Sequence, residues 1–210
     1  MRTIVFDLDG TILDSRERHS LLLRDILDEI NIFVDPQKLN DYLKYKSDGY
    51  STKKFLVDIC KLSYENADIC SKIWISRIEN REYILRDELY PGVKEVLEYM
   101  LQKYKLILLT ARRDKRLLEY QLKKFDIHKT FNEIICVNPL NAKEEKKTAV
   151  SNLKNVFVYF GDTEVDYNAA IKNNVLFCAM DYGFRSKLYW NKKGIITYSD
   201  LKEAIKKYNI

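Results

Sequence analysis

Short, continuous runs of apolar residues alternate with amphipathic stretches along most of the chain. Continuous runs are typical of parallel strands buried on both faces, and they predict strands at 3–6, 106–109, 134–137, 156–160 and 175–179, with a weaker one at 194–197. Helical spacing of apolar residues occurs at 93–100, 117–125, 149–153 and 201–208. Strands that alternate with helices of this length imply βαβ crossovers, so the pattern predicts an α/β fold built on a parallel sheet.

The section from about residue 15 to residue 88 breaks this alternation. It contains no convincing strand, and its apolar residues fall at helical spacing, as they do at 22, 23, 26, 27 and 30. Turn-forming residues separate the helical patterns at 35–36 and 47–49, and Pro91 and Gly92 mark the return to the sheet. We therefore predict two units, a sheet core made of 1–14 and 89–210 and a helical cap made of 15–88.

The composition of the 210 residues is that of an ordinary globular protein, with 46% hydrophobic and 32% charged positions. A net charge of +5 spread along the chain is typical of a solvated surface, so we expect no nucleic-acid partner. No apolar run approaches the ~18 residues of a membrane span, and acidic residues interrupt the first apolar stretch, unlike a signal peptide. We expect a cytoplasmic protein without a membrane partner.

Two carboxylates, Asp7 and Asp9, follow the first predicted strand in the stretch Asp-Leu-Asp-Gly-Thr at 7–11. The carboxyl ends of parallel strands are where open α/β sheets bind ligands. Crowded carboxylates repel one another, so this arrangement requires a cation or a shared proton. Asp and Gly also form ordinary turns. A chance match to four fixed residues is nevertheless rare, at roughly one chain in a thousand of this length, which favours a functional site.

Further polar groups fall at equivalent places in the predicted sheet. Thr110 follows the second strand at a helix start, where a hydroxyl and free amides bind a phosphate-sized anion. Asp162 and Asp166 follow the fourth strand, four residues apart on the next turn. Lys146 lies on the sheet-facing side of the preceding helix. Each has an ordinary explanation as a helix cap, an acidic helix start or a surface lysine. Together they supply acids, a hydroxyl and a lysine for one phosphoryl site.

These motifs resemble the haloacid dehalogenase superfamily, in its phosphatase branch with a helical cap. The four family motifs are Asp-Leu-Asp-Gly-Thr at 7–11, Thr110 after a Leu-Ile-Leu-Leu run, a lysine within 143–147, and Gly-Asp-Thr-Glu-Val-Asp at 161–166. The resemblance covers about 1–14 and 90–198, and the stretches LYPGVKEVLEYM and DYNAAIKNNV are similar to phosphoglycolate-phosphatase-like members. It implies a Rossmann-like parallel sheet with helices on both faces and an inserted α-helical cap.

The resemblance also implies roles for these residues in a Mg²⁺-dependent phosphatase of small phosphate monoesters. Asp7 would be the nucleophile that becomes an aspartyl phosphate, splitting one difficult step into two. Asp9 would protonate the leaving alcohol and then deprotonate the attacking water. Thr110 would bind a phosphoryl oxygen, and Lys146 would neutralise charge on the nucleophile and phosphate. The alternatives to this lysine are Lys147 and then Lys143.

The metal site implied by the resemblance consists of oxygen ligands. Mg²⁺ would be held by the Asp7 carboxylate, the Asp9 carbonyl and the Asp162 carboxylate, and Asp166 would hold metal-bound waters or steady the lysine. Oxygen ligands with retained waters suit Mg²⁺ better than Zn²⁺.

The resemblance further implies a small phosphorylated metabolite as the substrate, because a cap of this size would limit access to the site. The expected substrate-binding residues are Gly10, Thr11, Ala111, Arg112 and His19. Arg16 and Arg18, which lead into the cap, are further candidates, although a solvated hinge is the simpler interpretation of each. Cap aromatics such as Trp74 are better explained by core packing. We expect a monomer or a homodimer.

Two other functions remain open. A sugar phosphomutase such as β-phosphoglucomutase has the same core, and the spacing of Asp14 and His19 resembles that enzyme. A receiver-type signalling domain also phosphorylates a strand-end aspartate, but it is about half this length and its acids precede the phosphorylated strand. The presence of Asp9 favours phosphate esters over the substrates of the dehalogenase and phosphonate-hydrolase branches.

Overall fold

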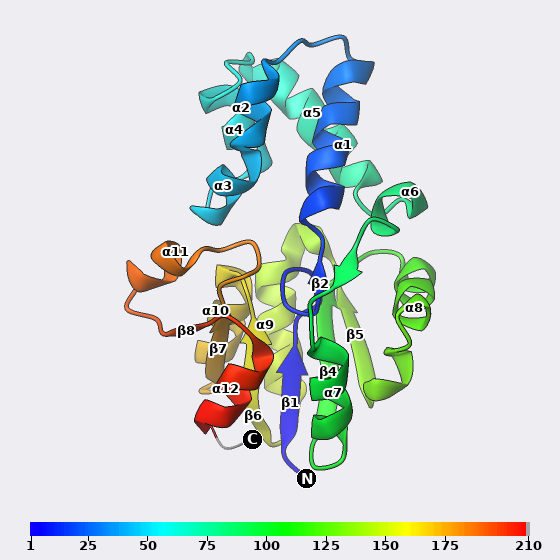
Figure 1. The fold of residues 1–210 in the computed structure, drawn as a ribbon, viewed down its shortest axis with the longest axis vertical. Coiled ribbons are helices and arrows are strands. Elements are labelled where there is room, and N and C mark those ends of the chain that lie inside the picture. Colours follow the sequence, from blue (N-terminus) through cyan, green and yellow to red (C-terminus); the bar gives the residue numbers. More distant parts are fainter. Residues whose placement is uncertain (209–210) are drawn as a thin grey trace.

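A six-stranded parallel sheet forms the centre of the computed structural model, which describes residues 1–208 (Figure 1). The strand order is β5-β4-β1-β6-β7-β8, and every neighbouring pair is parallel. The strands are β1 (Thr3–Phe6), β4 (Lys105–Ala111), β5 (Glu133–Val137), β6 (Val156–Gly161), β7 (Leu176–Met180) and β8 (Thr197–Tyr198). The predicted parallel sheet is therefore confirmed, with strand ends that shift by a few residues.

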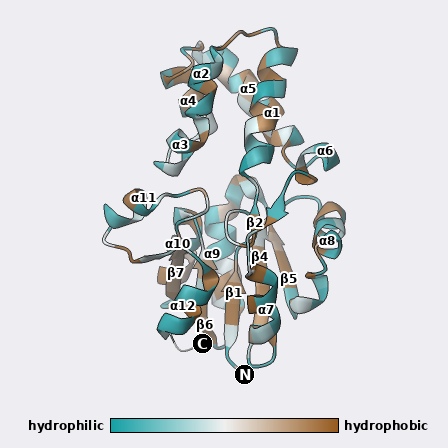
Figure 2. Ribbon diagram, viewed as in Figure 1, coloured by the Kyte–Doolittle hydropathy of each residue, from teal (hydrophilic) through white to brown (hydrophobic). Residues whose placement is uncertain are grey.

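Helices cover both faces of this sheet because alternate side chains of each strand point to opposite faces. In β1, Ile4 and Phe6 join one apolar cluster while Val5 joins the other. The first cluster includes α7 (Val93–Leu101), α8 (Lys115–Lys124) and α12 (Leu201–Tyr208), and the second includes α9 (Ala142–Asn152), α10 (Glu164–Ile171) and α11 (Lys187–Asn191). Figure 2 shows the sheet strands as largely hydrophobic. Short 3₁₀ turns occupy His128–Thr130 and Pro139–Asn141.

Six helices stand above the carboxyl end of the sheet and form the helical insertion, residues 16–84 (Figure 1). They are α1 (Arg16–Glu29), α2 (Pro36–Asn40), α3 (Tyr42–Ser47), α4 (Thr52–Asp58), α5 (Tyr64–Arg77) and α6 (Arg81–Ile84). Ser51 and Ser63 cap α4 and α5 by accepting backbone hydrogen bonds. The insertion has its own apolar cluster, which includes Leu22, Phe55 and Cys70. The boundaries of the predicted domains stay a prediction.

Two short strands connect the insertion to the sheet. β2 (Leu13–Asp14) pairs antiparallel with β3 (Glu88–Leu89). We predicted no strand between residues 15 and 88, and this prediction is wrong at residue 88, which belongs to β3. A strand of two residues has no apolar periodicity, so nothing in the local pattern could reveal it. Within residues 1–208, no helix combines the length and the apolar character needed to cross a membrane.

Candidate active site

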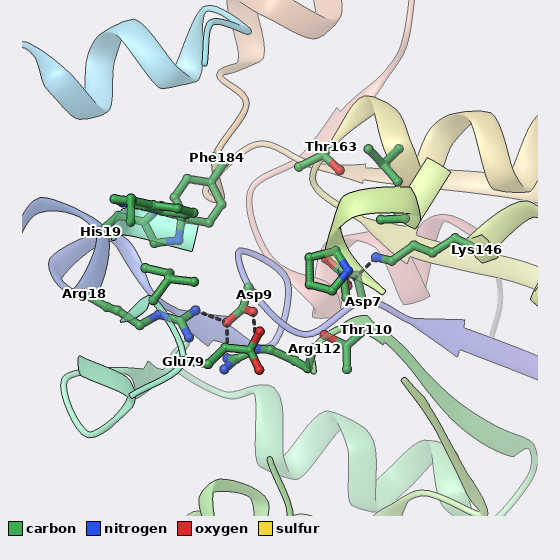
Figure 3. A pocket seen from close by; sticks show the side chains of 16 residues that line it. Asp7, Asp9, Arg18, His19, Glu79, Thr110, Arg112, Lys146, Thr163 and Phe184 are labelled. Atoms are coloured by element: carbon green, nitrogen blue, oxygen red, sulfur yellow. Dashed lines mark hydrogen bonds and ion pairs between the residues drawn. The ribbon is translucent and has the colours of Figure 1, made fainter. Parts of the chain in front are cut away.

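The sequence-predicted residues meet at the carboxyl edge of the sheet, because β4, β1 and β6 are neighbours there. A cavity of about 220 Å³ lies between this edge and the helical insertion (Figure 3). Asp7, Asp9, Thr110, Ala111 and Lys146 line it from the sheet side, and helices α1 and α5 of the insertion line the opposite side. The edge and the insertion thus enclose one small space.

Lys146 joins two of the predicted carboxylates. Its Nζ lies 2.7 Å from Oδ1 of Asp7 and 2.7 Å from Oδ1 of Asp166, and all three side chains are buried. Burial alone would lower the pKa of Lys146, but Asp166 and Asp7 outweigh it and hold that pKa above its ordinary value. Lys147 instead pairs with Glu144 at the surface, and Lys143 is exposed. Only Lys146 of the three predicted lysines reaches the site.

Asp7, Asp162 and Asp166 form a buried acidic cluster in which one oxygen from each lies within 4.8 Å of the others. Burial, followed by the charge of Asp166, raises the pKa of Asp7 to about 7. Burial, followed by the charge of Asp7, raises the pKa of Asp162 well above its ordinary value. Oδ1 of Asp162 is buried and has no hydrogen-bond partner among the described residues. These oxygen donors fit a hard divalent cation, which would satisfy that atom and relieve the repulsion.

Asp166 is fully hydrogen-bonded within the protein. Besides Lys146, it accepts bonds from the hydroxyl of Tyr159 at 3.0 Å and from the amide and hydroxyl of Thr163 at 3.2 and 2.7 Å. The Thr163 contacts form a capping box at the start of α10. The site therefore holds Asp166 in one orientation, which in turn fixes Lys146.

Asp9 is held by two buried arginines (Figure 3). Arg112 donates from Nε and Nη2 at 2.8 Å each, and Arg18 donates from Nη2 at 2.6 Å. Burial would raise the pKa of Asp9, but Arg112 and Arg18 outweigh it and lower that pKa to about 2. Arg112 was expected to contact substrate and Arg18 was more simply explained as a solvated hinge residue, yet both are buried and line the cavity. Sequence reasoning missed that they bind Asp9.

Asp87 completes this network and was also missed by the sequence. It is buried, lies 3.3 Å from Nε of Arg18, and accepts a 2.6 Å hydrogen bond from Gln121. Burial raises its pKa to about 7, although Arg18 opposes the shift. Asp87 stands between Arg86 and Glu88, where the local pattern is that of an exposed linker. No signal in the sequence pointed to its burial.

Gly10 and Thr11 are not among the cavity-lining residues, although the sequence named both as substrate-binding. Gly10 has a φ of +84°, and a Cβ there would lie 2.1 Å from Oδ2 of Asp162. Thr11 is fully buried, and its carbonyl accepts a 2.8 Å bond from Tyr182. Both residues shape the turn that brings Asp162 close to β1.

His19 lies in the wall that faces the sheet. Its ring packs 5.0 Å from the ring of Trp74 and 4.4 Å from the ring of Phe184. Burial lowers the pKa of His19 well below its ordinary value, so the imidazole is neutral near pH 7. Glu79, two residues after the end of α5, also lines the cavity and accepts a 2.8 Å hydrogen bond from the amide of Arg113. Phe184 and Glu79 lie far in sequence from every motif, so only the fold brings them here.

Comparison with known proteins identifies several similar chains. A family model described as haloacid dehalogenase-like hydrolase matches residues 4–180. Among curated proteins, the beta-phosphoglucomutase of Bacillus subtilis (strain 168) is 31% identical over 104 residues. That match covers 46% of this chain and 44% of the relative, so it spans less than half of either protein.

Solved structures match over nearly the whole chain. A haloacid dehalogenase-like family hydrolase from Streptococcus pneumoniae has a TM-score of 0.76 at 19% identity, covering 99% of this chain and 98% of its own. A predicted phosphatase from Clostridium acetobutylicum has a TM-score of 0.73 at 22% identity, with 99% and 97% covered. A predicted phosphoglycolate phosphatase from Haemophilus somnus 129pt has a TM-score of 0.72 at 21% identity, with 99% and 98% covered. At these identities the likeness shows a shared fold.

Proposed function

Because this chain belongs to the haloacid dehalogenase-like hydrolase family, we propose that it is a Mg²⁺-dependent phosphatase that acts through an aspartyl phosphate on Asp7. Membership of the family confirms the sequence-based prediction of a hydrolase. The observation that carries the finer proposal is the contact of Lys146 with both Asp7 and Asp166, next to Asp162. The proposed nucleophile Asp7, the ammonium of Lys146 and the proposed metal ligands therefore lie together at one point.

In the proposed first step, a carboxylate oxygen of Asp7 forms a bond to phosphorus, and the bond from phosphorus to the ester oxygen breaks. Lys146 binds Oδ1 of Asp7, which orients the carboxylate and leaves Oδ2 to attack. In the second step, water attacks the phosphorus, and the Asp7 oxygen is released as a carboxylate. Lys146 also neutralises charge on the transferring group, which Thr110 binds from β4.

Asp9 is proposed to move the protons of both steps, giving one to the leaving alcohol and later taking one from the water. As the structure stands, Arg112 and Arg18 hold Asp9 as a carboxylate, the form that accepts a proton. Donation requires the protonated form, so we infer that substrate binding draws an arginine away from Asp9. Arg18 belongs to α1 of the insertion, so its position changes whenever the insertion moves.

The proposed metal is Mg²⁺, held by the carboxylates of Asp7 and Asp162 with the carbonyl of Asp9, while Asp166 would hold metal-bound waters or steady Lys146. When bound, it would supply positive charge to the phosphoryl oxygens. The unpaired Oδ1 of Asp162 supports this assignment, because a buried carboxylate oxygen without a partner is destabilising.

The proposed substrate is a small phosphorylated metabolite. A cavity of about 220 Å³ admits a phosphoryl group and a short leaving group, and is below the ~300–1,000 Å³ of ordinary drug-sized pockets. A sugar phosphomutase is the second candidate, favoured by His19 in the cavity wall and by the partial match to beta-phosphoglucomutase. The cytoplasmic location and the monomeric or homodimeric state stay predictions.

The test is phosphate release from a panel of small phosphate esters, with Mg²⁺ and with EDTA. We expect Mg²⁺-dependent release that Asp7→Asn abolishes, while Asp126→Asn, at an exposed carboxylate paired with Lys94, retains it. Turnover by Asp7→Asn at the wild-type rate would show that Asp7 is not the nucleophile. Isomerisation of a sugar 1-phosphate without net phosphate release would favour the mutase.

A further inference from the structure

Residues 183–186, which follow β7, run directly past the acidic cluster. The amide of Phe184 donates a 2.5 Å hydrogen bond to Oδ2 of Asp162. A Cβ at Gly183 would lie 2.4 Å from the same oxygen. The ring of Phe184 then packs against His19 of α1. Phe184 therefore binds Asp162 through its amide and contacts the helical insertion through its ring.

The same segment binds the tip of the insertion at the end of α3. Arg185 donates from Nη1 to the carbonyl of Lys46 at 2.8 Å, and the amide of Ser186 donates to the carbonyl of Ser47 at 3.1 Å. The ammonium of Lys46 lies 5.2 Å from the ring centroid of Phe184. The tip is thus attached to the sheet unit through backbone carbonyls. Figure 1 shows α3 above α11, on this side of the molecule.

Glu164, which belongs to the same unit as Arg185, orients the Arg185 guanidinium for this contact. Its Nε and Nη2 bind the two carboxylate oxygens of Glu164 at 2.7 and 2.8 Å, a two-point pairing that fixes the plane of the guanidinium. Nη1 is left pointing at Lys46. Glu164 begins α10 and Arg185 precedes α11, so this ion pair does not involve the insertion. It can persist if the insertion moves away.

The tip also fits closely against α11. Gly49 has a φ of +94°, and a Cβ there would lie 2.6 Å from Cε2 of Tyr189. Tyr189 in turn donates from its hydroxyl to Glu164 at 3.3 Å. The surface that receives the tip is therefore built around the same ion pair that orients Arg185.

We propose that Arg185 is a positioning residue that holds the tip of the helical insertion closed over the cavity. We call Glu164, Arg185 and Ser186, with the carbonyls of Lys46 and Ser47, the clasp. The proposal rests on the proposed function, since closing the insertion matters only if chemistry occurs below it. Separating the clasp breaks hydrogen bonds to carbonyls, and water can then bind those carbonyls. The free-energy cost of opening is therefore small enough for the insertion to open and close repeatedly. Closure excludes water and places His19 and Trp74 over the substrate.

The test compares Arg185→Met with Arg77→Met. Arg77 also makes a two-point pair, with Glu29, but both members of that pair lie within the insertion. The two native tryptophans report closure, because Trp74 lines the cavity whereas Trp190 is fully buried in the sheet unit. In Arg185→Met we expect greater acrylamide quenching of Trp74 and a fall in kcat/KM of about tenfold, mostly through KM. Arg77→Met is expected to change neither.

A second pair of variants tests the clasp without touching Arg185. Gly49→Ala and Gly194→Ala both place a side chain at a positive φ, but within residues 1–208 no atom lies within 4 Å of a Cβ at Gly194. We expect Gly49→Ala to raise Trp74 quenching and lower kcat/KM as Arg185→Met does. Gly194→Ala introduces only the backbone strain, so it is expected to retain the wild-type values of Trp74 quenching and kcat/KM.

The quenching measurement separates this proposal from the proposed function, since it needs no turnover. Increased quenching in a protein that hydrolyses no ester would support the clasp and contradict the phosphatase. Wild-type quenching in both Arg185→Met and Gly49→Ala would overturn the clasp, whatever the activity. A loss of activity at unchanged quenching would also overturn it, because Arg185 would then act otherwise than by closure.

Discussion

Lys146 shows how one residue acquires its environment from helix geometry. It lies three and four positions before Ala149 and Val150, so it shares the face of α9 that packs on the sheet. Lys147, one position later, points about a quarter of a turn away and pairs with Glu144 at the surface. Two adjacent lysines therefore have unlike surroundings, and the difference is testable.

We predict that Lys146→Met lowers kcat by about 10²–10³-fold, because it removes the cation that faces the nucleophile and the transferring group. It also leaves Asp7 and Asp166 buried without their common partner. Lys147→Met, which breaks only the exposed pair with Glu144, is expected to stay within about twofold of wild type. Steady-state phosphate release measures both, and equal losses would contradict the assignment of the lysine.

Gly10 shows that a motif residue can serve the chain path rather than the substrate. The sequence analysis placed it among the expected substrate-binding residues. Its φ is positive, and a Cβ at this position would lie only 2.1 Å from Oδ2 of Asp162. Glycine therefore allows β1 and the loop after β6 to meet. The glycine of this motif is therefore required for the packing of the acidic cluster.

At the scale of elements, the helical insertion has the features of a separate folding unit. Its helices share an apolar cluster that does not include the sheet residues, and β2 and β3 connect it to the sheet. Phe55 is fully buried in this cluster and packs 5.2 Å from the ring of Tyr42. Phe33 belongs to the same unit but is 89% exposed.

We predict that Phe55→Ala destabilises the insertion by about 3–5 kcal/mol through loss of burial and a residual cavity. Hydrogen exchange is expected to accelerate in α1, α4 and α5, while β1 and β4 stay protected, because their clusters do not depend on Phe55. Phe33→Ala is the control and is expected to leave exchange unchanged. Equal acceleration in the sheet would show that residues 15–88 are not an independent domain.

For the molecule as a whole, three buried carboxylates that share one lysine make the stability of the fold depend on pH. Burial raises the pKa of Asp7 from 3.8 to about 7. Between these values the folded protein holds a proton that the unfolded chain has released, so stability falls as pH rises through this window. The effect is at most about 1.4 kcal/mol per pH unit for one group. A metal cation bound at the cluster would replace the proton and offset the loss of stability.

We therefore predict that saturating Mg²⁺ raises Tm more at pH 8 than at pH 5.5, because at the lower pH Asp7 keeps a competing proton. Calorimetric titration near pH 6 is expected to show proton release on Mg²⁺ binding. Asp162→Asn, which removes a ligand charge, is expected to lose most of the gain in Tm at both pH values. A gain that is the same at pH 5.5 and pH 8 would contradict the role of Asp7 as a ligand.

The parallel sheet and the residues at its carboxyl edge could be predicted from the amino-acid sequence, because both depend on local features. Continuous apolar runs mark buried strands, and in a parallel sheet all carboxyl ends meet at one edge, which placed Asp7, Thr110 and Asp162 together. Helical periodicity was enough to place Lys146 on the sheet side. The family model that matches residues 4–180 then confirmed the resemblance that these motifs indicated.

The surroundings of these residues depend on contacts between segments that are far apart in the sequence. Asp87, Glu79 and Arg185 look like solvated charges in the chain, and become buried or paired because segments far apart in sequence converge on them. Neither the pairing of Asp9 with two arginines nor the clasp has a local pattern. Arg112 binds Asp9 from the end of β4, 103 residues along the chain, and both Arg18 and the carbonyl of Lys46 reach the sheet unit from the insertion. Charge pairing depends on three-dimensional distance, and periodicity carries no information about it.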